Sequence, residues 1–211
     1  MPPTVTPPER LWYTGDAAAD RLLAAQPLAL LIGFVLDQQV TVQKAFSGPL
    51  ELQQRLAAPL DAARLAAMDP ASLAALFQAR PALHRFPGAM AERVQAVCAA
   101  IVRDYDGDAA RIWLDARDGA DLRRRLLALP GVGDMKAASI IAVLARRFDL
   151  HLPGLEDVLP HRPTLGDVDS AESLAAYQAG KRAYKAMLRA GGTPADAGAA
   201  AMASQVRSTR P

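Results

Sequence analysis

The stretch from Pro27 to Leu36 is the one that most limits what this chain can fold into. It reads PLALLIGFVL, and its side chains are apolar on nearly every side of a helix, with proline at a position suited to a first helical turn. A helix of this composition is stable in water only when other elements surround it. We therefore expect a central buried helix, which ends abruptly in the polar residues Asp37, Gln38 and Gln39.

The rest of the sequence also favours helices. Alanine and leucine dominate, aromatic residues make up only 5%, and no stretch shows sustained alternation of strand-forming residues. Hydrophobic residues make up 51% of the 211, which is enough to bury a large interior. The sequence therefore predicts an all-α fold.

Capping residues indicate where several helices begin. Thr41 is suited to cap the helix that follows the buried one, and Asp69 with Pro70 marks another helix start. Gly48 and Pro49 should kink or break the helix that Thr41 opens. The remaining helices are expected at residues 16–25, 90–105, 120–129, 134–148 and 171–189, with a loop at residues 149–168.

Charge gives little direct information, because the formal net charge is only +2. The arginines nevertheless form two local clusters, Arg123, Arg124 and Arg125, and then Arg146 and Arg147. Each cluster is either a solvated helix face or part of a basic surface that binds phosphates.

Cysteine and targeting signals narrow the class of protein. The single cysteine, Cys98, lies in an apolar run, so we expect a buried thiol; one cysteine excludes an internal disulfide or a four-cysteine iron–sulfur cluster within this chain. The first residues lack the pattern of a signal peptide, and no stretch approaches the roughly 18 apolar residues of a membrane span. We expect a cytoplasmic, nucleoid-associated protein without a membrane partner. The three histidines are too scattered to form a recognisable metal site.

The turn LPGVG, residues 129–133, lies between two of the expected helices. A first glycine, Gly131, lets the chain reverse sharply, and a second, Gly133, leaves the first amides of the next helix uncovered. These amides and the positive end of the helix dipole suit a phosphate, so Gly131, Val132 and Gly133 are candidate contacts to a nucleic-acid backbone. The alternative is that Pro-Gly simply ends one helix and Gly133 starts another.

Three stretches, in this order, resemble the HhH-GPD superfamily of base-excision DNA glycosylases, which includes endonuclease III. They are LLIGFVLDQQVT, MAERVQAVCAAIVRDYDGD and LPGVGDMKAASI, and the resemblance covers residues 20–148. It implies a helix-hairpin-helix motif at residues 120–147, duplex DNA with a damaged or abasic nucleotide as partner, and a monomer. It implies no cofactor here beyond an optional monovalent cation at the hairpin carbonyls.

The resemblance fails at the two positions that carry the family's chemistry. The family's nucleophilic lysine falls on Met135 when the glycines are aligned, and Lys136 lies one residue later, about 100° around the helix. Lys136 is therefore either a nucleophile, a phosphate contact or a solvent-exposed residue. The family's aspartate, which stabilises the sugar cation, has no clear counterpart. Glu156 and Asp157 are the candidates, and Asp149 is a less suitable one; the alternative is that all are exposed loop carboxylates.

Gln38 and Gln39 are candidates for contact with the DNA stack, since the resemblance places an inserted glutamine there and an amide can fill the gap that a flipped base leaves. The alternative is that this polar pair caps the buried helix. Asp134 at the mouth of the turn should stabilise the next helix through its dipole and weaken DNA binding.

We expect two helical lobes with a DNA-binding cleft between them. Residues 27–149 form a bundle that carries the hairpin, and residues 16–26 with 150–190 form the other lobe. Residues 1–15 and 191–211 are expected to be flexible. The function implied is hydrolysis of the N-glycosidic bond of a damaged base by water, in a monofunctional glycosylase. The alternatives are a protein that binds damaged DNA without cutting it, a lyase that uses Lys136, and a helical protein unrelated to nucleic acid.

Overall fold

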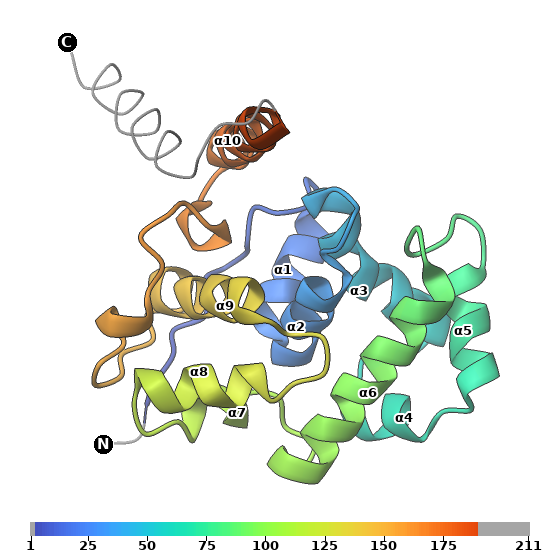
Figure 1. Ribbon diagram of the computed structural model, residues 1–211. Coiled ribbons are helices and arrows are strands. Elements are labelled where there is room, and N and C mark those ends of the chain that lie inside the picture. The colour runs from blue at the N-terminus through green and yellow to red at the C-terminus, as the bar shows by residue number, and fades with distance from the viewer. Residues whose placement is uncertain (1–2, 190–211) are drawn as a thin grey trace.

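The computed structural model describes residues 3–189, which form ten α-helices and two short 3₁₀ helices and contain no strand (Figure 1). This confirms the all-α prediction. Residues 191–211, expected to be a flexible tail, lie outside the described part of the chain. The helices are α1 Ala17–Ala25, α2 Pro27–Leu36, α3 Val42–Leu56, α4 Ala62–Ala67, α5 Pro70–Gln78, α6 Pro87–Tyr105, α7 Arg111–Leu114, α8 Gly119–Leu127, α9 Asp134–Arg147, η1 Glu156–Val158, η2 Leu165–Asp167 and α10 Ala171–Arg189.

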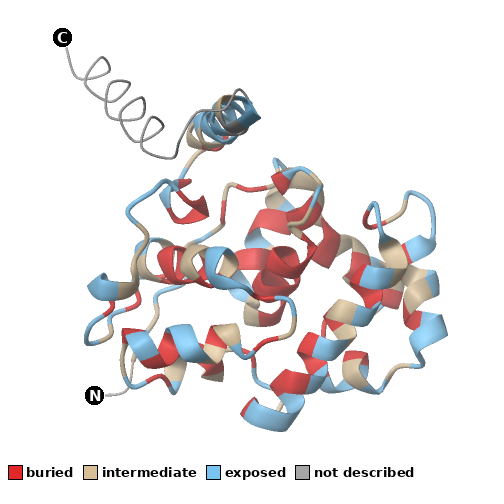
Figure 2. Ribbon diagram, viewed as in Figure 1, coloured by how far each residue is buried: buried red, intermediate tan, exposed pale blue. Residues whose placement is uncertain are grey.

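The central helix is α2, as its composition predicts. Every residue of α2 after Pro27 is buried, and the helix packs against α1, α3 and α6 (Figure 2). The predicted caps form as well, since the side chain of Thr41 accepts the amide of Lys44 and that of Asp69 accepts the amide of Ser72. Cys98 on α6 is fully buried, and burial raises the pKa of its thiol to about 12.

Two glycines allow α2 and α3 to pack closely. A Cβ atom added to Gly33 of α2 would lie 2.5 Å from Cδ1 of Phe46, and one added to Gly48 of α3 would lie 2.5 Å from Cδ1 of Leu36. The ring of Phe46 also makes edge-to-face contact with the ring of Phe34, with centroids 5.1 Å apart. This contact fixes the path of the chain on both sides of the segment that contains Asp37 and Gln38.

We expected Gly48 and Pro49 to kink or break a helix, and the helix is not broken there. Helix α3 continues through both residues from Val42 to Leu56. Proline removes one backbone hydrogen bond, but Phe46 and Leu52, on either side of it, are fully buried. The burial of this face stabilises the helix more than the lost bond destabilises it.

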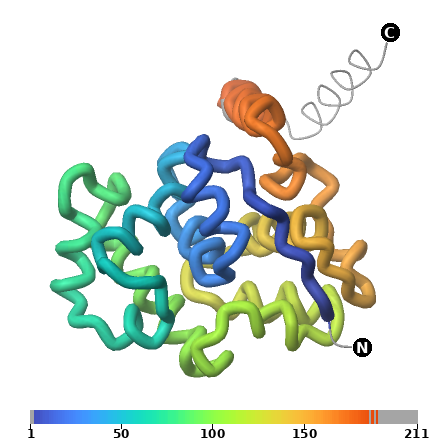
Figure 3. Tube along the Cα trace, turned by 180° about the vertical axis from the view of Figure 1, so that it is seen from behind, coloured from blue at the N-terminus to red at the C-terminus, as the bar shows by residue number. Residues whose placement is uncertain are grey.

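The first described residues pack against the body of the protein, although we expected residues 1–15 to be flexible. Leu11 and Tyr13 are buried, and the segment runs across the back of the molecule past α9 (Figure 3). The amide of Thr6 donates to the carbonyl of Phe148 at 2.7 Å, and the Tyr13 hydroxyl donates to the carbonyl of Leu165 at 2.8 Å. The apolar side chains of this segment need burial, and this need overrides its high proline content.

One hydrophobic cluster runs through both of the expected lobes, 27–149 and 16–26 with 150–190. Helix α1 packs on α2 and α3, and η2 packs on α9. Helix α10 stands at the edge of the molecule, where it contacts η2 and donates a hydrogen bond from Gln178 to Gln43 at 2.7 Å (Figure 1). Within residues 3–189 no single helix combines the length and hydropathy of a membrane span; α1 and α2 reach them only together, across a 115° bend.

Replacing Gly33 by alanine should destabilise the fold by about 1–3 kcal/mol, because the new methyl group overlaps the ring of Phe46. The matched control is Gly88→Ala on α6, where the nearest atom is 3.9 Å from the added Cβ. Chemical denaturation of both variants checks this prediction. Equal stabilities of the two variants would contradict the close packing of α2 and α3.

Candidate nucleic-acid interface

A short turn joins α8 to α9 and reverses the direction of the chain (Figure 1). Gly131 adopts a left-handed φ of +77°, which a residue with a side chain rarely takes, and Gly133 is the N-cap of α9. Val132 is buried and its amide donates to the carbonyl of Leu129 at 3.1 Å. Two helices joined by a short turn are therefore present near residues 120–147. The helix-hairpin-helix motif itself stays a prediction.

The amides of this turn face outward. Within the described part of the chain, no acceptor pairs with the N–H groups of Gly131, Gly133, Asp134 and Met135, and all four residues are exposed. The first intrahelical bonds of α9 come from Lys136 and Ala137, which both donate to the carbonyl of Gly133. The free donors and the positive end of the α9 dipole together form a surface suited to an anion.

Arg93 of α6 connects this turn to the end of α2. A Cβ atom on Gly131 would lie 2.6 Å from Cδ of Arg93, so the absence of a side chain at this position leaves room for the arginine. The Arg93 guanidinium donates from Nη1 to Oε1 of Gln38 at 2.6 Å. The turn and the polar end of α2 therefore lie next to each other.

The end of α2 also holds Lys136. The Lys136 amine donates to the carbonyl of Val35 at 3.2 Å, and the same carbonyl accepts Nε2 of Gln38 at 2.9 Å. Burial lowers the pKa of the Lys136 amine to about 8; the negative charge of Asp37 opposes this shift and the positive charge of Arg93 adds to it. We refer to Asp37, Gln38, Arg93, Lys136 and the Val35 carbonyl as the α2-end cluster.

Gln38 and Gln39 differ in their surroundings. Gln38 bonds the helix carbonyl of Val35 and receives Arg93, which is the capping role that was one of our two interpretations. Gln39 is exposed and adopts a left-handed φ of 55°. Its side chain makes no hydrogen bond within residues 3–189. Of the two glutamines, Gln39 is therefore the one whose amide faces solvent in a strained backbone position.

A further loop is attached to this cluster. The Nε2 atom of the buried His84 lies 2.8 Å from the carbonyl of Gln38, while its Nδ1 accepts the amide of Phe86 at 3.0 Å. Phe86 is 42% exposed, and Arg85 lies 5.2 Å from its ring centroid. An exposed aromatic ring therefore lies next to the end of α2.

The two arginine clusters are largely neutralised by aspartates. Asp121 is buried and binds Arg124 and Arg125 of its own helix. Burial alone would raise the pKa of the Asp121 carboxyl, but hydrogen bonds from the Arg117 amide and from these two arginines lower it to about 2. The remaining arginines also have partners: Arg123 pairs with Asp134, Arg146 with Asp167 and Arg147 with Asp169. Of the two interpretations of these runs, paired helix faces fit better than an open basic surface.

Glu156 and Asp157 do not lie near the α2-end cluster. They form part of η1, which packs against α8, and the amide of Gly119 at the start of α8 donates to the carbonyl of Pro153. Glu156 shares a surface hollow of ≈ 380 Å³ with Arg146 near the end of α9. Lys136 lies near the start of α9, and ten residues of helix span about 15 Å. Asp149 is exposed beside His151, with Oδ1 and Nε2 3.1 Å apart.

Metal and cation sites receive no support from side-chain clusters. No group of three or more His, Cys, Asp or Glu residues that could hold a metal ion is present between residues 3 and 189. The hairpin carbonyls of Leu129 and Gly133 accept amides of the chain itself. A monovalent cation at the hairpin therefore stays a prediction.

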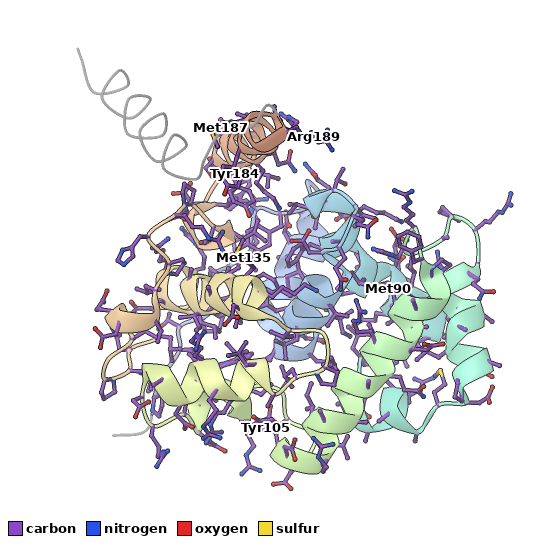
Figure 4. All side chains as sticks on the ribbon, in the orientation of Figure 1. Met90, Tyr105, Met135, Tyr184, Met187 and Arg189 are labelled. Atoms are coloured by element: carbon purple, nitrogen blue, oxygen red, sulfur yellow. The ribbon has the colours of Figure 1, made fainter. Side chains whose placement is uncertain are left out.

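Sequence reasoning missed the roles of three residues in or beside the α2-end cluster. The charges of Arg93 and Asp37 act on the Lys136 amine. Burial raises the pKa of Tyr177 on α10 to about 12, and the negative charge of Asp37 adds to this shift. Met135, labelled in Figure 4, takes the family's lysine position. Its side chain is 66% exposed, and its sulfur lies 3.1 Å from Nη2 of Arg162. The abrupt polar end of α2 was the only sequence signal for Asp37; Arg93 and Tyr177 lack one.

No protein-family model, curated protein or solved structure significantly matches this chain.

Replacing Gly131 by alanine should cost about 1–2 kcal/mol of stability for the left-handed φ alone, and more because the methyl group displaces Arg93. Gly133→Ala is the matched variant, since nothing lies within 4 Å of its added Cβ and its φ is −95°. Its stability should change by less than about 1 kcal/mol. Denaturation midpoints test both, and a destabilised Gly133→Ala with an unaffected Gly131→Ala would refute this description of the turn.

Proposed function

We propose that this chain is a base-excision DNA glycosylase-like protein that binds duplex DNA through the α8–α9 turn and attacks the sugar of a damaged nucleotide with the Lys136 amine. One observation carries the proposal. A half-buried amine whose pKa is lowered to about 8 directly follows four exposed backbone donors that have no acceptor within residues 3–189. An anion-binding turn beside a reactive amine suits a substrate that has both a phosphodiester backbone and an electrophilic sugar carbon.

In this proposal the turn binds the backbone without reading sequence. Because the arginine runs are paired with aspartates, the amides of Gly133, Asp134 and Met135 supply much of the phosphate contact. Gln39 is exposed at the end of the buried helix, so its amide is available to fill the space of an extruded base. Phe86 is available to stack beside it.

The chemical step needs the neutral form of Lys136. With a pKa of about 8, about a tenth of the amine is neutral at pH 7, whereas an ordinary lysine is almost fully charged. The nitrogen lone pair forms a bond to C1′ as the N-glycosidic bond breaks, and the base leaves with the electron pair of the glycosidic bond and takes a proton from solvent. The C1′–O4′ bond then breaks, O4′ takes the proton that the nitrogen loses, and an iminium ion remains on Lys136. This lysine-mediated route replaces the water-mediated route that Met135 at the family's lysine position suggested.

A second function, recognition of damaged DNA without catalysis, is favoured by the hydrogen bond between Lys136 and Val35. The amine must leave this carbonyl before it can attack a sugar carbon. If it does not leave, the exposed turn still binds the backbone, and the protein marks a lesion without cutting it.

Borohydride trapping on a panel of damaged and abasic duplexes tests the proposed chemistry. We expect a covalent adduct that Lys136→Gln abolishes and that Lys44→Gln, on α3 where Lys44 pairs with Glu51, leaves unchanged. Base release without an adduct would support the water-mediated route. Salt-dependent binding with neither product would support recognition without catalysis.

Binding through the turn is tested with a duplex that carries an uncleavable abasic analogue. Gly133→Ala places a methyl group among the exposed amides without touching the fold, and we expect it to weaken binding about tenfold. Gly88→Ala serves as the control. Equal affinity of Gly133→Ala and the unmodified protein, or affinity that does not fall with salt, would exclude the turn as the backbone contact.

A further inference from the structure

Two opposite charges, from the end of α2 and from α6, act on the Lys136 amine. Asp37 follows the end of α2, two residues after the Val35 carbonyl that accepts the Lys136 amine at 3.2 Å. Arg93 reaches the same place from α6, held by Gln38 at 2.6 Å and by the space that Gly131 leaves. The charges of both residues act on the amine, and in opposite directions.

Opposed charges matter at a lysine that forms an iminium ion, because its charge changes twice. The amine must first lose a proton to become a nucleophile, and the product then carries a positive charge again. A nearby cation favours the neutral amine, and a nearby anion favours both cationic forms.

We propose that Asp37 and Arg93 are opposed positioning residues for Lys136, in which Arg93 speeds attack by keeping the amine neutral and Asp37 prolongs the life of the iminium ion. This inference rests on the proposed function for its biological meaning, but it concerns any aldehyde that reaches Lys136. No carboxylate of η1 is needed for it.

The reaction with an aldehyde balances without a further reagent. The neutral nitrogen forms a bond to the carbonyl carbon, and the C–O bond then breaks. The oxygen leaves as water with one proton from the nitrogen and one from solvent, and the iminium carries the remaining positive charge. Hydrolysis reverses each step, so an anion that stabilises the iminium slows its loss.

Other charged or titratable groups around the amine each have a contact of their own. Tyr177 faces Asp37 from α10 and stays protonated, and Asp134 on the same helix as Lys136 pairs with Arg123. His84 is bound to the carbonyl of Gln38, and Arg162 contacts Met135. The variants Asp37→Asn and Arg93→Met leave these groups in place, and each removes one charge of the α2-end cluster.

The test uses glycolaldehyde as a small probe on the full chain, with borohydride quenching and peptide mapping by mass spectrometry. The chain contains only four lysines, Lys44, Lys136, Lys181 and Lys185, so each site is read separately and Lys44 and Lys181 serve as internal controls. Formation is followed from pH 6 to pH 10. Loss is followed after a scavenger of free aldehyde is added, with quenching at intervals.

We expect Asp37→Asn to form the Lys136 adduct about threefold faster at pH 7 and also to lose it about threefold faster, since both effects follow from removal of one negative charge. Arg93→Met should slow both rates by a similar factor. Asp37→Glu, which keeps the carboxylate, should behave like the unmodified protein, and the rates at Lys44 and Lys181 should not change.

Unchanged or slower formation in Asp37→Asn would overturn the inference, as would an Asp37→Glu variant that behaves like Asp37→Asn. Circular dichroism of each variant checks that the fold is kept. This test can fail or succeed independently of the test of the proposed function. If the adduct rates change in opposite directions in Asp37→Asn and Arg93→Met but no DNA adduct forms, the roles of the two charges are supported and attack of Lys136 on DNA is refuted. If a DNA adduct forms but the rates do not change, attack on DNA is supported and the roles of the two charges are refuted.

Discussion

The burial of α2 on all sides is the constraint on which the rest of the structure depends. A helix enclosed by other elements must still satisfy its last carbonyl groups, and α2 ends at Leu36 without a glycine cap. The amides of Asp37 and Gln38 satisfy the carbonyls of Gly33, Phe34 and Leu36. Among the described residues, only side chains donate to the Val35 carbonyl, namely those of Gln38 and of Lys136 on α9. The Val35 carbonyl at the buried end of α2 needs a donor, and this hydrogen bond positions the Lys136 amine.

The same constraint explains why the site depends on hydrogen bonding more than on net charge. The arginines that could have made a basic surface are paired with Asp121, Asp134, Asp167 and Asp169. Exposed pairs such as that of Arg123 with Asp134 contribute little stability, but they cancel much of the local field. The donors that remain are backbone amides at the start of α9, which favour an anion through direction and dipole.

The fold was largely predictable where local physics decides it. The apolar run of α2, the caps Thr41 and Asp69, and the start of α10 followed from composition and capping chemistry. Prediction failed where distant residues decide, as at Pro49, where a buried helix face overrides the proline. The site shows the same division. The turn at Gly131 and Gly133 could be found from sequence, whereas Arg93 and Asp37 reach Lys136 only through folding, from positions far apart in the chain. Glu156 and Asp157 were chosen by order along the chain, which does not give their distance from the turn.

The acceptor that holds Lys136 belongs to the main chain. A substitution at position 35 changes the side chain but leaves the carbonyl oxygen in place as long as α2 keeps its backbone, so no codon change at that position deletes the acceptor. Gln38, Arg93 and Asp37 act through side chains and can each be lost in one step. Genetic drift would therefore remove the side chains that change the pKa of the Lys136 amine before it removed the Val35 carbonyl that accepts its hydrogen bond. A descendant chain would keep the position of the lysine but change its pKa.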